Sequence, residues 1–325
     1  TFFIFLGLII ADMGNTATEF AGVAGSMQVF GISKYISVPI GALLVWLLVV
    51  KGSYKSAERI FLVFSAFLLC YVVSAIYAKP DWSRIGTAMI KPQIEMSTAY
   101  ISMVIGMVGT TIAPWMQFYM QSSVIEKGIK IEDYKYEIWD IVLGCTITVV
   151  VAFFIIVSCA ATLHEKGISI NEAKDAAVAL KPLAGAFASQ IFAFGLLVAS
   201  IFSAAILPLA TAFYICEAFG YEAGVNKKPS EAPQFYGLFT AIIVIGVIII
   251  LIPNAPLISI TIWTQIINGM LLPVVLICMM LMVNDKEIMG KYVNNKIKNI
   301  IGWTTIIVLI SLTVILTFSP LFIKH

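Results

Sequence analysis

Long apolar runs separated by short polar loops make up most of the chain. A run of about 18 or more apolar residues is long enough to cross a bilayer as a helix. The pattern therefore predicts an all-α integral membrane protein with about nine spans. These spans cover residues 2–30, 36–50, 56–77, 98–126, 138–163, 184–216, 235–252, 258–283 and 300–318.

Composition agrees with this class. Hydrophobic residues make up 60% of the chain and charged residues only 12%, whereas soluble domains carry about 25% charged residues. The five cysteines are scattered singly through apolar segments, without the spacing of a metal site or a disulfide framework. Lysine and arginine are more frequent in alternate loops, and we assign that side to the cytoplasm. We expect a multi-pass protein of a prokaryotic cell membrane.

The fourth run contains its own interruption. Pro114 cannot donate a backbone hydrogen bond and clashes with the preceding turn, so the carbonyls around Thr110 and Thr111 are freed where no lipid can satisfy them. Broken helices of this kind hold the substrate or a coupling ion in secondary transporters. The pattern predicts a binding site at the break, and a simple proline kink is the alternative.

The first run carries a polar stripe. Asp12, Asn15 and Glu19 stand at positions i, i+3 and i+7, so they share one helix face. Ionisable residues inside membrane spans are costly, and they therefore suggest function. The stripe is interpreted either as part of a transport pathway or as a set of polar groups that fix helix packing.

Glutamines provide further neutral oxygen ligands. Gln265 lies beside Thr264 in an apolar span, where its carboxamide can contact a cation or form a helix–helix hydrogen bond. Gln117 and Gln121 follow the break on one helix face and are expected to line a cytoplasmic vestibule. Both histidines lie outside the predicted spans, which leaves no imidazole for a transition metal or a proton relay there. Without a phosphate-binding loop or a nucleophile motif, the chain is predicted not to be an enzyme and to need no cofactor.

These motifs resemble the Nramp divalent-metal transporters, which have a LeuT-like inverted-repeat fold. Residues 106–115 are similar to the family's sixth helix, whose signature is Met-Pro-His after a Gly-Ala-Thr stretch. Residues 17–23, Ala-Thr-Glu-Phe-Ala-Gly-Val, are similar to the third helix's Ala-Thr-Asp-Leu-Ala-Glu-Val. Gln265 falls where the tenth helix carries a substrate-contacting glutamine.

The resemblance runs nearly end to end and implies one transporter domain over residues 1–325. Residues 1–77 would be the remainder of the first repeat, 98–283 the second repeat and 296–325 an extra C-terminal helix. The chain is then expected to hold family helices three to eleven and to be a fragment. The first two helices would be missing, and with them the family's metal-binding Asp-Pro-Gly-Asn motif.

Departures from the family pattern narrow the expected substrate. Ala113 and Trp115 stand where transition-metal members place methionine and histidine, Gly22 replaces a glutamate of the proton route, and Met120 replaces a second histidine. A methionine sulfur favours soft ions over Mg²⁺. The pattern resembles the Nramp-related magnesium transporters, which carry Mg²⁺ and also Mn²⁺ without evident proton coupling.

Mg²⁺ prefers oxygen ligands and keeps several waters. The resemblance implies a metal site whose oxygens come from the backbone near Thr110 and Ala113 and from Gln265, with Glu19 holding bound waters. Trp115 is either a substrate contact or a space-filling aromatic ring. The remaining pathway candidates are Asp12, Asn15, Thr111, Gln117 and Gln121.

The expected function is uncoupled Mg²⁺ or Mn²⁺ transport by alternating access. The metal ion would be the substrate of a monomer in the lipid bilayer, with no nucleic-acid partner. A proton-coupled Mn²⁺/Fe²⁺ transporter with relocated ligands is the alternative within the family. An amino-acid carrier or a receptor with the same fold would need a Gly-rich unwound segment suited to a carboxylate, which residues 110–115 do not resemble.

Overall fold

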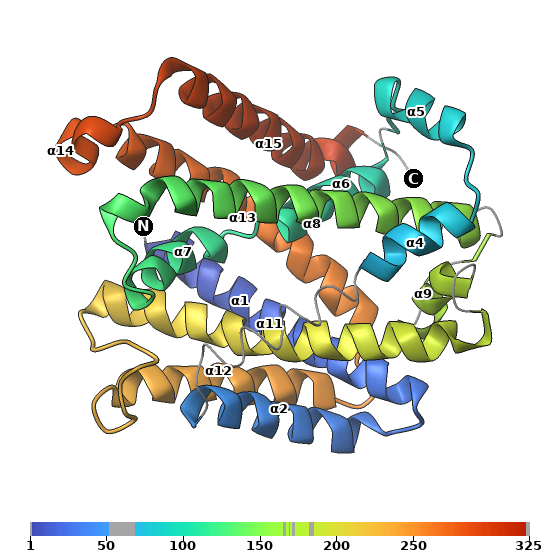
Figure 1. Ribbon diagram of the computed structural model, residues 1–325, viewed down its shortest axis with the longest axis horizontal. Coiled ribbons are helices and arrows are strands. Elements are labelled where there is room, and N and C mark those ends of the chain that lie inside the picture. The colour runs from blue at the N-terminus through green and yellow to red at the C-terminus, as the bar shows by residue number, and fades with distance from the viewer. Residues whose placement is uncertain are drawn as a thin grey trace. The chain divides into compact units, whose positions relative to one another are not determined.

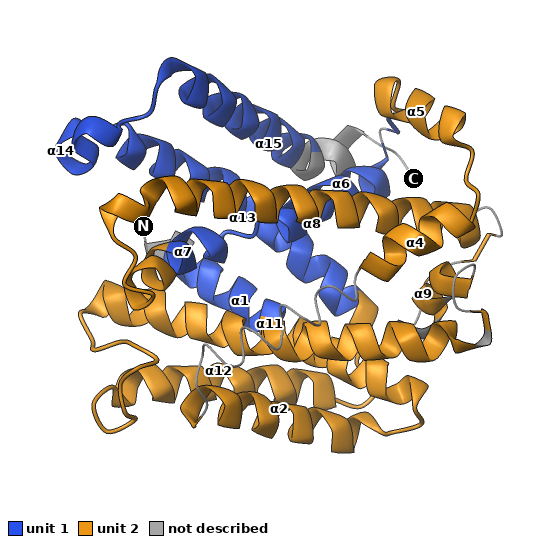
Figure 2. Ribbon diagram, in the orientation of Figure 1, with its two compact units in different colours: residues 1–15, 93–120, 259–325 blue, residues 16–92, 121–258 orange. Residues whose placement is uncertain are grey.

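The structure is a computed structural model that describes residues 2–51, 69–95, 97–164, 167, 168, 170, 173–181 and 185–322. In these ranges the regular elements are helices. They form two compact units whose segments interleave along the chain (Figure 2). Unit 1 contains residues 1–15, 93–120 and 259–325, and unit 2 contains residues 16–92 and 121–258. Because these units interleave, they do not test the division into repeats at 1–77 and 98–283, which stays a prediction.

Unit 1 contains the first half of α1 and the helices around the predicted break (Figure 1). Its elements are α1 (Phe2–Val29) up to Asn15, α6 (Thr98–Thr111), the start of α7 (Trp115–Glu126), most of α13 (Leu257–Val283), α14 (Lys286–Met289), η6 (Gly290–Tyr292) and α15 (Lys296–Phe322). α6 and α15 pack against each other.

Unit 2 contains the rest of α1 and the end of α7. Its other elements are α2 (Lys34–Val50), α4 (Cys70–Tyr77), α5 (Trp82–Ile90), η2 (Ile131–Asp133), α8 (Tyr134–Thr162), α9 (Ala173–Ala176), η4 (Ala177–Leu180), η5 (Gly185–Phe187), α11 (Ala188–Phe219) and α12 (Pro233–Leu251). α11 packs against α12 and α2, and it carries buried small residues such as Ala204, Ala210 and Ala212. Small side chains let helix backbones approach closely in a membrane.

Six helical segments in the described part of the chain are long and apolar enough to cross a membrane. They are Thr98–Glu126, Ile131–Thr162, Ala188–Phe219, Pro233–Leu251, Leu257–Val283 and Lys296–Ile315. α2 is apolar but has only 17 residues. Most of the predicted span 56–77 lies outside the described residues, and only α4 is seen of it.

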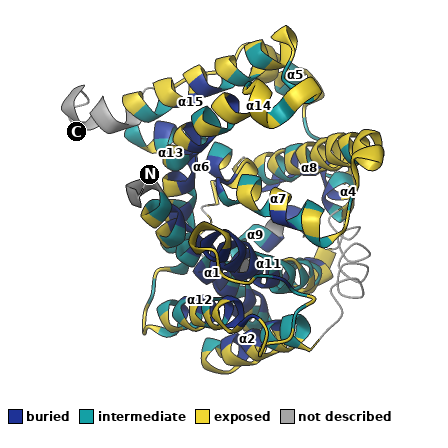
Figure 3. Ribbon diagram, turned by 90° about the vertical axis from the view of Figure 1, so that its left-hand side faces the viewer, coloured by how far each residue is buried: buried dark blue, intermediate teal, exposed yellow. Residues whose placement is uncertain are grey.

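Apolar side chains are exposed along whole helix faces, as expected for a protein whose solvent is lipid. Figure 3 shows long exposed stretches on α8 and α15. Trp139 on α8 is 72% exposed and Ile307 on α15 is 61% exposed. Contiguous apolar surface of this extent is unusual on a soluble monomer. The burial pattern therefore agrees with the prediction of an integral membrane protein.

Local sequence signals set several helix ends. The Ser97 hydroxyl accepts a hydrogen bond from the Tyr100 N–H at 3.2 Å and caps the start of α6. α12 begins at Pro233, where a missing N–H does no harm. α11 ends at Phe219 and is capped by Gly220, whose φ of 70° is the left-handed conformation that glycine adopts without strain.

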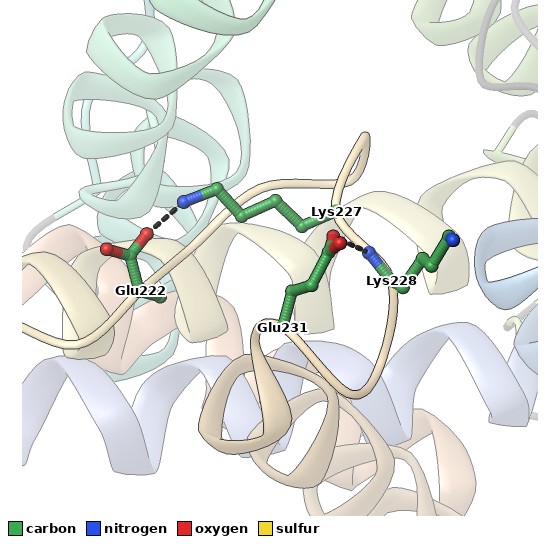
Figure 4. A network of polar contacts seen from close by, with 4 residues as sticks. All are labelled: Glu222, Lys227, Lys228 and Glu231. Carbon is green, nitrogen blue, oxygen red and sulfur yellow. Dashed lines mark hydrogen bonds and ion pairs between the residues drawn. The ribbon is translucent and has the colours of Figure 1, made fainter.

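Polar contacts order the loop between α11 and α12 (Figure 4). Lys227 forms an ion pair with Glu222, which lowers the pKa of that carboxyl. The Lys228 N–H donates to the Glu231 carboxylate at 2.8 Å. These groups are exposed, where ion pairs contribute little to stability, so we attribute to them the shape of the loop rather than the stability of the fold.

Two buried serines attach a short helical turn to the main helices of unit 2. The hydroxyls of Ser74 on α4 and Ser158 on α8 both donate to the Ala179 carbonyl, at 2.8 and 2.7 Å. All three residues have 0% exposure. The contacts satisfy a carbonyl of η4 that would be costly to bury without a hydrogen bond.

Lys34 binds the end of α12, and its removal is expected to destabilise unit 2. Its Nζ donates to the carbonyls of Ile250 and Ile252 at 2.9 and 2.8 Å, where a helix C-terminus attracts positive charge. We expect Lys34→Met to lower the free energy of unfolding by about 1–2 kcal/mol. Thermal melting of detergent-solubilised protein measures this, with Lys51→Met at an exposed position as control. Equal melting of the two variants would contradict the role of Lys34.

Candidate functional site

The predicted break is confirmed. α6 ends at Thr111 and α7 begins at Trp115. The Ile112 N–H still donates to the Val108 carbonyl at 2.9 Å, but Pro114 offers no N–H to the Thr110 carbonyl one turn earlier. The Thr111 hydroxyl donates to the Met107 carbonyl at 2.7 Å, so it contributes to the last turn of α6.

Gln117 caps the carbonyls inside the break. With its amide nitrogen placed as the neighbouring acceptors require, the side chain donates to the carbonyls of Ala113 and Pro114 at 2.9 and 2.7 Å. The Ala113 carbonyl also accepts from the Met116 N–H at 3.1 Å. The Ala113 carbonyl oxygen was expected to bind a metal, and in the structure it accepts two hydrogen bonds. An ion that binds the Ala113 carbonyl would have to displace the Gln117 carboxamide.

Close glycine contacts bring α6 against α13 within unit 1. A Cβ built on Gly109 would overlap the Gln265 carbonyl oxygen and would lie 2.9 Å from the Gly269 Cα. A Cβ on Gly269 would in turn lie 3.1 Å from the Ile105 carbonyl carbon. The two backbones touch at the residue before Thr110. The structure thus places Gln265 beside the broken end of α6, as required if Gln265 and the break residues are to contact the same ion.

A chain of buried polar side chains joins α1 to α13, also within unit 1. Asn15 donates to the Asp12 carboxylate at 3.1 Å, and Asn268 donates to the side-chain oxygens of Asn15 and Gln265 at 2.7 and 3.1 Å. Asp12, Asn15 and Asn268 are at most 4% exposed. The helices come close here, because a Cβ on Gly14 would lie 2.8 Å from the Thr264 hydroxyl. Within the polar stripe, Asn15 therefore engages the helix that carries Gln265 and links Asp12 to it.

Glu19 belongs to unit 2, where it bonds a residue that sequence reasoning did not select. Ser200 on α11 forms a side-chain hydrogen bond with Glu19. The same hydroxyl occupies the space beside Gly22, since a Cβ there would overlap it and would lie 3.1 Å from the Ser200 Cβ. A glutamate at position 22 would not fit without displacing Ser200.

The predicted site residues fall in both units. The break residues Thr110 and Ala113, the glutamine Gln265 and the polar residues Asp12 and Asn15 all lie in unit 1. Trp115 and Gln117 lie there as well. The centroids of the Trp115 and Tyr119 rings are 6.1 Å apart. Glu19 and the exposed Gln121 lie in unit 2.

Asn268 was missed, although its position three residues after Gln265 on one helix face was a usable signal. Ser200 offered no comparable signal, because it is one of several serines in a long apolar run and nothing in the sequence distinguishes it. No group of three or more histidine, cysteine, aspartate or glutamate side chains that could hold a metal occurs among the described residues.

Comparisons with known proteins agree with this architecture. The family described as Natural resistance-associated macrophage protein-like, Nramp, matches residues 1–319. The divalent metal cation transporter MntH of Yersinia pestis (strain Pestoides F) is 24% identical over 329 residues, which cover 96% of this chain and 75% of that protein. MntH of Clostridium acetobutylicum is 24% identical over 257 residues, which cover 77% of this chain and 57% of that protein.

A solved structure supports the fold. A crystal structure of the Eremococcus coleocola manganese transporter, in complex with an aromatic bis-isothiourea substituted compound, matches with a TM-score of 0.74 at 19% identity, over 98% of this chain and 70% of that chain. A point mutant of the same transporter matches with a TM-score of 0.72 at 18% identity, over the same shares of the two chains. At this identity the likeness concerns the fold alone, and the expected all-α, LeuT-like transporter fold is confirmed.

Proposed function

Since this chain belongs to the Nramp family, we propose that it is a divalent metal cation transporter of the multi-pass, plasma-membrane type. It is a transporter rather than an enzyme, and its metal is substrate rather than cofactor. The broken helix beside Gln265 is the observation that supports this function most directly. Such breaks place free backbone oxygens at the depth where a substrate ion must lose part of its hydration shell.

We propose further that the substrate is Mg²⁺, with Mn²⁺ as a second substrate. Ala113 is 4% exposed at the break and brings no sulfur to it. Oxygen atoms remain: the Thr110 carbonyl, the Gln265 carboxamide and, when Gln117 moves, the Ala113 carbonyl. Mg²⁺ accepts neutral oxygen ligands and keeps several waters, whereas a soft ion gains from methionine or histidine. Trp115 would restrict the space around such a partly hydrated ion.

Transport without proton coupling is the third part of the proposal. Gly22 carries no titratable group, and Ser200 fills the space beside it. Trp115 and Met120 cannot accept a proton either. Glu19, held by Ser200, is proposed to accept hydrogen bonds from waters that accompany the ion rather than to carry protons.

A proton-coupled Mn²⁺ transporter is the second candidate. The relatives reported above include proteins named MntH and a manganese transporter. Asp12 and Glu19 also remain in α1 as two carboxylates that can titrate. This candidate predicts that metal uptake brings protons with it, which the first candidate excludes.

Ion flux into liposomes tests the proposed substrate. Purified protein should transport Mg²⁺ at millimolar and Mn²⁺ at lower concentration, each followed with a metal-sensitive dye inside the vesicles. Cd²⁺ uptake at micromolar concentration with no response to millimolar Mg²⁺ would refute the magnesium proposal. Liposomes without protein provide the background.

Replacing Glu19 by glutamine is expected to weaken Mg²⁺ binding. The substitution keeps the volume and a hydrogen bond to Ser200 but removes the charge that strengthens hydrogen bonds from water. We expect a loss of about 1–3 kcal/mol in binding free energy with the fold intact. Calorimetric titration measures it, and Glu231→Gln in the exposed loop of Figure 4 is the matched control. An unchanged affinity in Glu19→Gln would return Glu19 to a packing role.

A further inference from the structure

The polar chain between α1 and α13 has a direction. Asn15 directs its amide nitrogen to Asp12 and its oxygen to Asn268, which donates to it at 2.7 Å. Asn268 directs the same nitrogen to the Gln265 oxygen at 3.1 Å. Two longer contacts of 3.4 Å, from Asn15 to the Asn268 oxygen and from Gln265 to the Asn15 oxygen, follow the same orientation.

The carboxylate of Asp12 sets this direction. A carboxylate only accepts hydrogen bonds, whereas the two ends of a carboxamide have nearly the same shape and differ in which end donates. Asn15 must therefore present its nitrogen to Asp12, which leaves its oxygen for Asn268. Asn268 must then present its nitrogen to Asn15, and the same nitrogen meets the oxygen of Gln265. Each orientation follows from the one before it, because the reverse would oppose two acceptors in a buried site.

We propose that Asn15 and Asn268 are positioning residues that transmit the polarity of the Asp12 carboxylate to Gln265. They hold the Gln265 carboxamide with its oxygen towards Asn268 and its nitrogen towards Asn15. Asn268 uses one lone pair of that oxygen, and the second lone pair remains for a cation or its water. This proposal deepens the proposed function and rests on it for the role of Gln265 towards metal.

A carboxamide held in one orientation lowers the free-energy cost of binding a cation. Without a fixed direction, Gln265 would present nitrogen as often as oxygen, and an arriving cation would have to select the correct orientation. Prior orientation removes that cost from binding. Asn268 acts through Gln265, so its loss should raise the KM for metal more than it lowers kcat.

We call the series of hydrogen bonds from Asp12 through Asn15 and Asn268 to Gln265 the relay. Moving the carboxylate from position 12 to position 15 tests it. Asp12→Asn removes the group that only accepts, so both directions of the chain become possible, and we expect metal affinity to fall about tenfold. The double variant Asp12→Asn with Asn15→Asp moves the carboxylate to the next residue in this series of hydrogen bonds. Asp at position 15 still accepts from Asn268 and Gln265 and can accept from Asn at position 12, while its second oxygen opposes the Asn268 oxygen at the 3.4 Å contact. We expect the double variant to recover most of the affinity.

The orientation of Gln265 is measured without transport. Side-chain ¹⁵N-labelled glutamine gives an NMR signal for its amide, assigned by its loss in Gln265→Leu. The signal should be single in the unaltered protein, shifted or doubled in Asp12→Asn and restored in the double variant. If Asp12→Asn does not fold, Asn268→Ser interrupts the same chain without changing charge and should also alter the signal.

The outcomes separate the two proposals. An unaltered Gln265 signal in folded Asp12→Asn or Asn268→Ser would overturn the relay, as would a double variant as impaired as the single one. If the unaltered protein carries neither Mg²⁺ nor Mn²⁺ in liposomes, the proposed function fails while the NMR signal still decides whether the relay exists.

Discussion

Gly109→Ala is expected to disrupt the packing of α6 on α13 and to lower the free energy of unfolding by about 3 kcal/mol or more. The added methyl group would overlap the Gln265 carbonyl oxygen and would lie 2.9 Å from the Gly269 Cα. Both obstacles are backbone atoms, so no side-chain rotation relieves the clash and the helices must separate. Thermal melting in detergent and the yield of monodisperse protein measure the effect.

Gly144→Ala is the matched control for this prediction. Gly144 lies in α8, and a Cβ there meets nothing within 4 Å. Alanine also favours a helix over glycine by up to about 1 kcal/mol, so this variant should melt at the same temperature or higher. If Gly109→Ala melts like Gly144→Ala, the contact between the break and α13 is wrong, and Gln265 loses its place in the site.

Ala113→Met is expected to change the ion preference of the transporter. A methionine sulfur at the break would favour Mn²⁺ and Cd²⁺, and we expect the ratio of Cd²⁺ to Mg²⁺ affinity to rise about tenfold or more, which corresponds to roughly 1.4 kcal/mol. Calorimetric titration with both ions gives this ratio. Mg²⁺ uptake should fall at the same time, because the larger side chain reduces the space for bound water.

Ala113→Leu separates sulfur from bulk. Leucine fills a similar volume without a ligand atom, so it should reduce Mg²⁺ transport and gain no affinity for Cd²⁺. If both variants changed preference equally, the size of residue 113 would control selectivity and the argument from ligand softness would fail.

The sequence predicted the parts of the site that depend on local chemistry. Pro114 predicts an interruption, because it offers no N–H to the carbonyl one turn earlier. Proline alone does not decide the outcome, since Pro39, Pro208 and Pro273 lie inside helices that continue past them. The spacing of Asp12 and Asn15 predicts a shared helix face, and the structure shows both residues in one buried polar chain. The apolar runs predict the membrane class and the long helices, although helix ends differ by several residues, as α8 shows by beginning at Tyr134 rather than 138.

What the sequence did not predict depends on contacts between distant segments. The pairing of Asn15 with Asn268 joins residues 253 positions apart. The place of Ser200 beside Gly22 requires α1 and α11 to pack in one register, which no local pattern specifies. Gln117 illustrates a different limit. Its expected place in a vestibule stays a prediction. The structure adds that it donates to carbonyls of the break, which the sequence did not indicate, because a buried carbonyl needs a donor.

Simultaneous measurement of metal and proton flux tests the central claim most directly. Liposomes that contain the protein, a Mg²⁺-sensitive dye and a pH-sensitive dye are given an inward Mg²⁺ gradient with the membrane potential clamped. Uncoupled transport predicts that lumenal Mg²⁺ rises while lumenal pH stays at the level of protein-free liposomes. A lumenal acidification that grows with the metal flux would contradict this account and would support the proton-coupled alternative, with Asp12 or Glu19 as the proton carrier.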